Sequence, residues 1–259
     1  FNLKINIMRN VNVNEPQNQQ SCQTSVMVSA VDHGDCLELM KDIPDSSIDM
    51  ILCDLPYGTT ACKWDTIIPF DRLWKQYNRI IKDNAAIVLF GSEPFSSLLR
   101  ISNLKNFRYD WIWDKKKAAN FAQSGFQPMK YHEIISVFYL KKSKYFPIKT
   151  DAIKRRKIDI PRDSTEDRVD SGLFKQAIYS DGYEPDKILP KSIISFSKDN
   201  YRSNIFHPTQ KPVELCEYLI KTYTNENDLV LDNCAGSGTT AIACLNTNRQ
   251  FIVMEKEQK

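Results

Sequence analysis

Four short apolar runs constrain the fold of this chain more than any other feature of its sequence. These runs span 48–53, 85–90, 228–231 and 250–254. Each is followed directly by a glycine, an aspartate or a glutamate, which is typical of parallel strands buried on both faces of a sheet. Segments 107–113 and 133–140 are two further candidates for strands.

Helical patterns separate the apolar runs. Residues 69–82 and 212–223 place apolar side chains at helical spacing, and the second segment starts with a proline, which suits the first turn of a helix. A third helix is expected over 239–247, after a loop that contains two glycines. This alternation predicts an α/β fold with a doubly wound, mostly parallel sheet. In such folds, ligands bind at the carboxyl ends of the strands.

The chain of 259 residues is long enough for one α/β domain with a modest appendage. Residues 1–25 are polar and lack the apolar core of a signal peptide, so we expect an N-terminal tail followed by one domain over 26–259. Segment 141–204 is charged and poorly periodic, which indicates an insertion in that domain. No run of 18 apolar residues is present, so no transmembrane segment is predicted.

Cysteine usage argues against both disulfides and metal binding. The seven cysteines show no CxxC spacing, and none of the three histidines is grouped with cysteine at the spacing of metal ligands. Several cysteines lie in apolar surroundings, which favours reduced thiols in a cytosol. We therefore predict no metal site.

Positive charge is concentrated in one part of the chain. The net charge is only +3, but residues 115–157 hold twelve Lys and Arg against two acidic residues, a local net charge of +10. Such a polarised distribution is typical of proteins that bind a polyanion such as nucleic acid. A solvated, lysine-rich face is the alternative interpretation.

A glycine-containing loop joins the third apolar run to a predicted helix. It reads Asp232-Asn-Cys-Ala-Gly-Ser-Gly-Thr-Thr240, and it is not a phosphate-binding Walker loop because no Gly-Lys-Ser/Thr follows. Its glycines let a ligand approach the backbone, and the helix start offers free N–H groups. Glu255, which closes the next strand, suits hydrogen bonds to ribose hydroxyls. Alone, such a loop could be a simple turn.

The first apolar run ends in Asp54-Leu55-Pro56-Tyr57. An exocyclic amino group of a base is a poor nucleophile because its lone pair is delocalised into the ring. A carboxylate and a backbone carbonyl that accept its two N–H bonds localise that lone pair, and an aromatic ring stacks on a flipped base. Asp54, the Leu55 carbonyl and Tyr57 could supply these groups. A strand-end turn with an exposed tyrosine is the alternative.

A third motif precedes the helix predicted over 212–223. It reads His207-Pro-Thr209-Gln-Lys211-Pro. A cation, a hydroxyl and free helix N–H groups together suit a carboxylate ligand. An ordinary helix start would look similar.

These three motifs, in this order, resemble the amino-methylating DNA methyltransferases of the beta arrangement, and most closely those of phages and prophages. The resemblance runs from about Asp32 to the C-terminus. It implies a Rossmann-like, S-adenosylmethionine-dependent methyltransferase fold, with 141–204 as a target-recognition insertion and 115–157 facing DNA. The implied cofactor is S-adenosyl-L-methionine, and the implied partner is double-stranded DNA.

Carried over residue by residue, the resemblance implies roles for the motif residues. Asp54, Leu55, Pro56 and Tyr57 match the catalytic loop. The other matches concern the cofactor: Asp35 near its adenine, Glu255 at its ribose, His207, Thr209 and Lys211 at its methionine end, and Asp232, Ala235, Gly236, Ser237, Gly238 and Thr239 in the glycine loop.

Three features depart from the family pattern. Leu55 replaces a proline, which should not matter if its carbonyl is what acts. Asn233 and Cys234 replace the usual Pro-Phe pair, so we expect looser packing beside the cofactor. The family usually continues into one more helix beyond the position of Lys259, which an additional tail would supply.

Contacts with DNA are predicted from charge and position. Candidate phosphate contacts are Lys115, Lys116, Lys117, Lys141, Lys142, Lys144, Arg155 and Arg156. Candidate readers of base edges are Asn120, Gln123, Ser124 and Gln127.

The resemblance predicts an adenine-N6 methyltransferase, because an aspartate at the first loop position favours adenine and a serine there is commoner for cytosine. The alternatives are an N4-cytosine methyltransferase, a DNA-binding homologue without activity, and an RNA methyltransferase. A homodimer and a cognate restriction endonuclease are further candidate partners by family analogy. The expected location is the cytoplasm of a bacterial or phage-infected cell.

Overall fold

The computed structural model describes residues 29–60, 62, 65–118, 120–151, 187–197 and 210–256. The chain divides into two units, of which the larger combines Phe1–Phe146 with Ser192–Lys259 and the smaller is Pro147–Lys191. In the smaller unit, β6 (Thr150–Asp151) pairs antiparallel with β7 (Lys187–Ile188). All other elements below belong to the larger unit.

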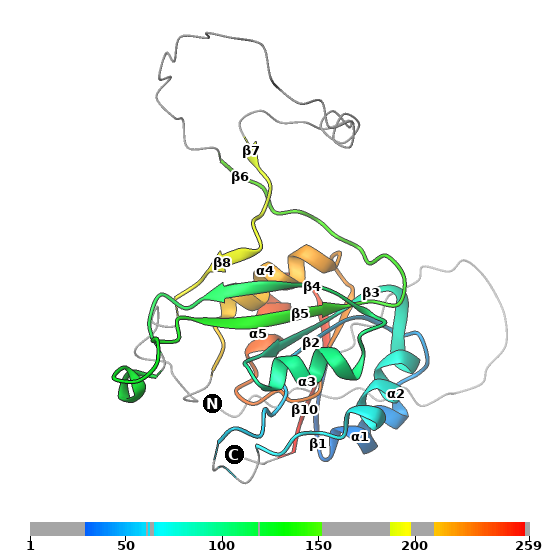
Figure 1. The fold of residues 1–259 in the computed structure, drawn as a ribbon. Coiled ribbons are helices and arrows are strands. Elements are labelled where there is room, and N and C mark those ends of the chain that lie inside the picture. The colour runs from blue at the N-terminus through cyan, green and yellow to red at the C-terminus, as the bar shows by residue number, and fades with distance from the viewer. Residues whose placement is uncertain are drawn as a thin grey trace, which may run out of the picture. The chain divides into compact units, whose positions relative to one another are not determined.

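An eight-stranded sheet forms the centre of the larger unit (Figure 1), in the order β1-β10-β9-β2-β3-β5-β4-β8. The strands are β1 (Ser29–His33), β2 (Ile48–Cys53), β3 (Ile81–Gly91), β4 (Phe107–Asp114), β5 (His132–Phe138), β8 (Ile193–Ser195), β9 (Leu229–Asp232) and β10 (Gln250–Glu255). All neighbours are parallel except at β5, which runs antiparallel to both β3 and β4. The predicted mostly parallel sheet is thus confirmed.

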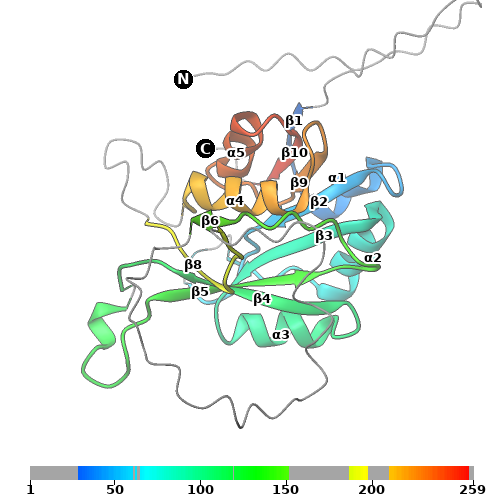
Figure 2. The same cartoon turned by 90° about the horizontal axis from the view of Figure 1, so that it is seen from above.

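Helices cover both faces of this sheet (Figure 2). On one face lie α1 (Cys36–Leu39), α2 (Phe70–Ile80) and α3 (Phe95–Ser102), and on the other lie α4 (Val213–Tyr223) and α5 (Thr239–Asn246). Ile51 and Cys53 of β2 pack in the hydrophobic core beneath α1, α2 and α3, whereas Met50 and Leu52 pack in the core beneath α4 and α5. Because β2 is buried on both faces, its sequence is apolar without alternation except at Asp49, which pairs with Lys82 and Lys144.

The strand order changes direction between β2 and β9. From β2 the chain continues outward to β3, whereas from β9 it continues outward to β10 on the other side. The two strands pair in parallel through Met50 with Val230 and Ile51 with Leu231. The connections that leave their carboxyl ends therefore run to opposite sides. The crevice between these connections is the usual ligand site of a doubly wound sheet.

Six strands and three helices lie close to their predicted positions, but other elements were not predicted. β1 has no fully buried residue, since it is the edge strand beside β10, and its sequence lacks an apolar run. α3 has only eight residues, three of which are serines. β8 is a three-residue strand that lies inside the segment expected to be an irregular insertion. No helix among the described residues has the length and apolar character needed to cross a bilayer.

Candidate active site

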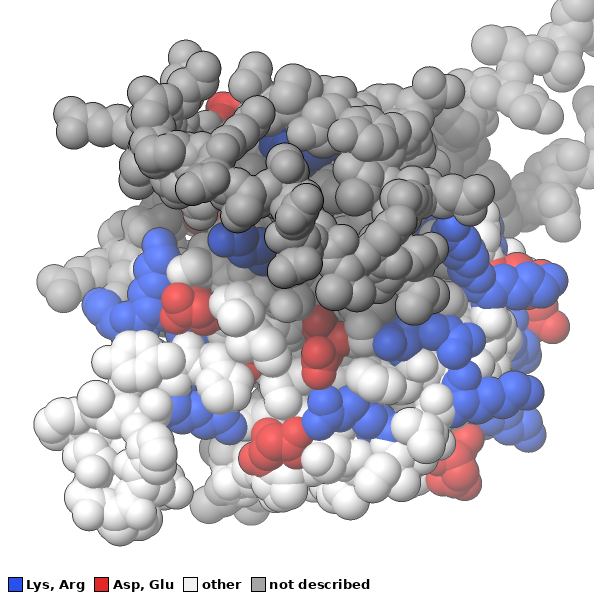
Figure 3. Space-filling view, turned by 45° about the horizontal axis from the view of Figure 1, so that its top comes forward, with Lys and Arg blue, Asp and Glu red and all other residues white. Residues whose placement is uncertain are grey.

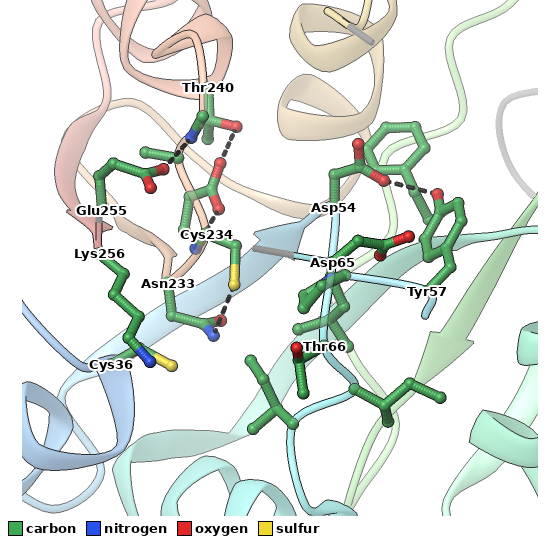
Figure 4. Close-up of a pocket in the computed structure, with 18 of the residues that line it drawn as sticks. Cys36, Asp54, Tyr57, Asp65, Thr66, Asn233, Cys234, Thr240, Glu255 and Lys256 are labelled. Atoms are coloured by element: carbon green, nitrogen blue, oxygen red, sulfur yellow. Dashed lines mark hydrogen bonds between the residues drawn. The ribbon is translucent and has the colours of Figure 1, made fainter. Parts of the chain in front are cut away.

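A cavity of about 480 Å³ opens at the carboxyl ends of β2 and β9 (Figure 4). Its volume lies within the range of roughly 300–1,000 Å³ typical of small-ligand pockets. Asp54, Tyr57 and Asp65 line one part, and Cys234, Thr240 and Glu255 line another. The two motifs that lie farthest apart in the sequence therefore share one cavity.

The side chain of Asp232 holds the glycine loop in its conformation through hydrogen bonds. Its carboxylate accepts hydrogen bonds from the Cys234 backbone N–H (3.0 Å) and the Thr240 hydroxyl (2.6 Å). Because the carboxyl is almost fully buried, its pKa is raised to about 6. Gly236 (φ +53°) and Gly238 (φ +75°) adopt left-handed conformations that L-residues rarely accept. Gly238 is also the N-cap of α5.

Two further acids stand beside this loop. Glu255 ends β10, and its Oε2 accepts the Gly236 N–H at 2.7 Å. Asp35 caps α1 by accepting the Leu37 N–H at 2.9 Å, and it lies 3.7 Å from the Lys256 ammonium. Both acids line the cavity.

The departure at Asn233 and Cys234 is compensated by a residue of α2. Asn233 is 2% exposed, and its Oδ1 accepts a hydrogen bond from the Tyr77 hydroxyl. The Asn233 amide also reaches the Cys234 sulfur at 3.5 Å. The expectation of looser packing was therefore wrong for Asn233, which is buried and paired.

The loop predicted to be catalytic begins at the end of β2. Asp54 Oδ1 accepts a hydrogen bond from the Tyr57 hydroxyl at 2.5 Å. The Tyr57 ring stacks on Phe95 of α3, with centroids 4.9 Å apart. Burial, together with the nearby Asp54 charge, raises the pKa of Tyr57, so its hydroxyl stays a neutral donor. Leu55 is 3% exposed and packs in the core.

Asp65 fixes the backbone that follows Tyr57, and no sequence pattern singled it out. Its carboxylate accepts three backbone N–H groups, from Gly58 at 2.8 Å, Thr59 at 2.9 Å and Thr60 at 2.7 Å. Burial alone would raise the pKa of Asp65, but hydrogen bonding from the Thr60 side chain and from the three backbone N–H groups lowers it overall. Carboxylates that accept several backbone N–H groups are held in their charged form.

Replacing Asp65 with alanine is expected to lower the free energy of unfolding by about 2 kcal/mol, because three backbone donors lose their acceptor. Asp65→Asn keeps one carbonyl oxygen and should lose less. Since the folded-state pKa of Asp65 is lowered, its stabilisation is present above the unfolded value of about 3.9 and is lost as the pH falls through the folded value. Denaturant unfolding between pH 7 and pH 3 measures this; a constant difference between Asp65→Asn and wild type would contradict it.

Lys211 lines the same cavity and lies against the Asp54–Tyr57 loop. Its Nζ is 2.6 Å from Asp54 Oδ2 and 3.2 Å from Glu133 Oε2. The ammonium also lies over the rings of Tyr57 and Phe90, 5.8 and 5.3 Å from their centroids. Burial alone would lower the pKa of Lys211, but the two carboxylates raise it above its usual value.

Glu133 of β5 joins Lys211 to a second lysine. Its Oε1 lies 3.2 Å from the Lys115 ammonium, and Lys115 is only 5% exposed. The prediction that Lys115 contacts a DNA phosphate was therefore wrong, because its charge is buried in an ion pair. Lys115, Glu133, Lys211 and Asp54 form a chain of alternating charges, which we call the charge relay cluster. Buried charges persist only when they are paired in this way.

The other predicted DNA contacts lie in different surroundings. Lys116, Lys117 and Lys142 are exposed. Lys141 pairs with Asp83 at 2.5 Å, and Lys144 pairs with Asp49 and Asp228. Lys144 therefore joins structural elements and is not a free phosphate contact. Four predicted site residues lie outside the described residues: Arg155, Arg156, His207 and Thr209.

Asn120 closes a loop rather than presenting its amide to a ligand. Its Oδ1 accepts the Lys130 backbone N–H at 2.5 Å, and its Nδ2 donates to the Pro128 carbonyl at 3.2 Å. Gln127 similarly donates to Gln123. These contacts give the amides of Asn120, Gln123 and Gln127 partners inside the loop, which does not favour the predicted role as readers of base edges.

Comparison with known proteins identifies the family. Residues 48–259 match a family model described as DNA methylase, of the N6/N4 methyltransferases. The chain is 26% identical over 248 residues to the Type II methyltransferase M1.MboII of Moraxella bovis, covering 87% of this chain and 90% of that protein. It is 27% identical over 237 residues to the DNA adenine methyltransferase YhdJ of Escherichia coli K12, covering 86% and 76%.

Solved structures share the fold. A crystal structure of an M1.HpyAVI–SAM complex superposes with a TM-score of 0.59 at 24% identity, covering 89% of this chain and 94% of that one. The cytosine-N4-specific PvuII DNA methyltransferase gives a TM-score of 0.62 at 17% identity, covering 89% and 83%. Because the family model matches residues 48–259, which is most of this chain, the chain belongs to the N6/N4 family of DNA methylases.

Proposed function

We propose that this protein is a site-specific DNA adenine-N6 methyltransferase that acts on a flipped-out adenine in double-stranded DNA. Its methyl donor is S-adenosyl-L-methionine. The observation that carries the proposal is that the Asp54–Tyr57 loop and the glycine loop after Asp232 line one cavity. A base held at the first loop would face a cofactor held at the second.

The residues of the second part of the cavity fit this cofactor. Glu255 and Asp35 offer carboxylates to hydroxyl and amino groups of a nucleoside, and the backbone at Gly236 is open, with no atom within 4 Å of a Cβ built there. The bound cofactor supplies a methyl group on a sulfonium, which needs no further activation. The protein therefore has to bind and orient the two reactants.

Asp54 activates the amino group by accepting one of its N–H bonds, which localises the lone pair on nitrogen. The ion pair with Lys211 and the hydrogen bond from Tyr57 hold its carboxylate in place before a base arrives. Such preorganised electrostatics lowers the barrier because nothing has to reorient during the reaction. No covalent intermediate is required: Cys53 is 1% exposed in β2, and burial raises its pKa to about 12.

Adenine is favoured over cytosine by Asp54 at the first loop position. The relative YhdJ, which is named a DNA adenine methyltransferase, supports the same choice. The second candidate is N4-cytosine methylation, which the fold of the cytosine-N4-specific PvuII enzyme also accommodates. A DNA-binding homologue without activity is disfavoured because Asp54 and Tyr57 are both present and mutually bonded. Relatives named Type II methyltransferases support a role beside a restriction endonuclease.

We expect DNA from methylation-deficient cells that express the protein to contain N6-methyladenine within one short sequence motif. Mass spectrometry of the digested nucleosides identifies the base, and methylation-sensitive sequencing identifies the motif. Cells that express Asp54→Ala are the control for host enzymes. N4-methylcytosine in place of N6-methyladenine would overturn the adenine assignment, and unmodified DNA would overturn the proposed activity.

A further inference from the structure

The loop between β4 and β5, residues 115–131, lies at the same edge of the sheet as Asp54. β3 runs parallel to β2, and its last residue, Gly91, pairs with Ile134 near the start of β5. Asp114, the last residue of β4, pairs with His132. The connection between Asp114 and His132 therefore projects from the edge where β2 opens into the catalytic loop (Figure 1).

This loop presents large apolar side chains to solvent. All residues from 121 to 129 are exposed, and Phe121 and Phe126 are each 78% exposed, the highest values among the large apolar residues of the described chain. Segment 118–129 contains no charged residue. In Figure 3 an uncharged lobe projects at the lower left, where Figure 1 places this loop, with Lys and Arg side chains beside it. Exposed aromatic rings gathered on one protrusion mark a contact surface.

The two rings are carried by an ordered support. The short 3-10 helix η2 (Phe121–Gln123) follows Asn120. The Asn120 side chain forms hydrogen bonds with the backbone of Pro128 and Lys130, in the part of the loop that leads back to β5. The Gln127 N–H donates to the Gln123 carbonyl at 3.1 Å. The Lys130 ammonium donates to Ser92, just after β3. These hydrogen bonds hold the base of the loop together and attach it to Ser92, at the carboxyl end of β3.

The surroundings of the loop favour DNA as the binding partner of the two phenylalanine rings. Lys116 and Lys117 are exposed at its start, where they can contact phosphates. The loop lies on the edge that a target base must enter to reach Asp54. A base that rotates out of a duplex leaves a gap in the stack, and proteins that distort DNA insert apolar wedges such as phenylalanine between base steps.

We propose that Phe121 and Phe126 form an aromatic wedge that enters the duplex at the target site and replaces the stacking lost when the base turns into the cavity. This inference rests on the proposed function, because it requires a flipped base. It assigns to residues 121–126 a role in unstacking the substrate, separate from the cofactor site and from the chemistry at Asp54.

The wedge is tested with Phe121→Ala, Phe126→Ala and the double variant, on two duplexes that carry the mapped motif. In one duplex the target base is normally paired, and in the other it lies opposite an abasic site and is already loosened. We expect kcat/KM of the double variant to fall roughly 10- to 100-fold on the paired duplex, the range of stacking contributions, and about 3-fold or less on the loosened duplex, since little unstacking work remains there.

The matched control is Leu104→Ala, which removes an apolar side chain that is 68% exposed before β4 begins, at the other end of that strand. It should leave kcat/KM on both duplexes unchanged. Equal losses on the two duplexes would overturn the wedge, and so would wild-type activity of the double variant on the paired duplex. A change in oligomeric state confined to the phenylalanine variants, measured by sedimentation, would assign the rings to a dimer interface instead.

A second readout separates the wedge from the proposed methylation. With 2-aminopurine at the target position, the wild-type protein should raise the fluorescence as the base unstacks, and the double variant should raise it much less at saturating protein. This holds whether or not methyl transfer occurs. An undiminished rise with the double variant would overturn the wedge, whereas a wild-type protein that unstacks the base without transferring methyl would refute only the proposed chemistry.

Discussion

Methyl transfer by the Asp54→Ala variant is expected to fall by on the order of 10³-fold or more, because the acceptor that localises the lone pair of the amino group is removed. The proposed pocket for the cofactor consists of Asp35, Glu255 and the glycine loop, and the hydrogen bonds of the Asp54 side chain go instead to Tyr57 and Lys211. Cofactor affinity measured by calorimetry should therefore change less than about threefold, the scale of a few tenths of a kcal/mol.

The matched control for this result is Asp83→Ala. Asp83 is also paired with a lysine, at 2.5 Å from Lys141, but its side chain is 64% exposed. Exposed ion pairs contribute about 0–1 kcal/mol, so this variant should match wild type in both activity and stability. An Asp54→Ala enzyme that retains a tenth of the wild-type rate would refute the catalytic assignment of the loop.

Lys211→Met is expected to lower the free energy of unfolding by about 3 kcal/mol, because it leaves the partly buried Asp54 and the buried Glu133 without the cation between them. Methyl transfer should fall by about 100-fold, since one of the two contacts that fix the Asp54 carboxylate is lost. Denaturant unfolding and initial rates at saturating cofactor measure the two effects.

The double variant Lys211→Met/Asp54→Asn tests whether the cluster acts as a unit. It removes one positive and one negative charge and leaves the Lys115–Glu133 pair intact, so it should regain part of the stability lost by Lys211→Met but not the activity. A double variant that is no more stable than the single one would argue against the charge relay cluster. The same measurements decide the role expected from the motif: if Lys211 binds the cofactor carboxylate, cofactor affinity should weaken at least tenfold while kcat stays near wild type.

Local features were predictable wherever neighbours in sequence decide the structure. The run at 48–53 is apolar except for Asp49 because β2 is buried on both faces, so its strand was located to the residue. The glycine loop was predictable because Gly236 and Gly238 occupy positive-φ positions between a strand and a helix. The Asp54 loop follows β2 directly, so its place at the sheet edge followed from the strand.

Features that depend on the strand order were not predictable. Lys211 and Asp54 are 157 positions apart, and Tyr77 and Asn233 are 156 apart, so neither contact leaves a local pattern. A count of basic residues places Lys115 and Lys144 with the surface lysines, because lysine is rarely buried. The structure shows that Lys115 is buried in an ion pair and that the partly buried Lys144 pairs with two aspartates, which only the arrangement of the strands reveals.

The junction of β2 and β9 has a consequence for how activity arises during synthesis. Met50 and Val230 are neighbours in the sheet but 180 positions apart, so this pairing forms only after the chain through β9 has left the ribosome. Until then the nascent protein carries the Asp54 loop without the second wall of the cavity. Methylation is therefore expected only after β9 and β10 have joined the sheet, so methylation activity should report this long-range pairing more strictly than a spectroscopic measure of helix or strand content.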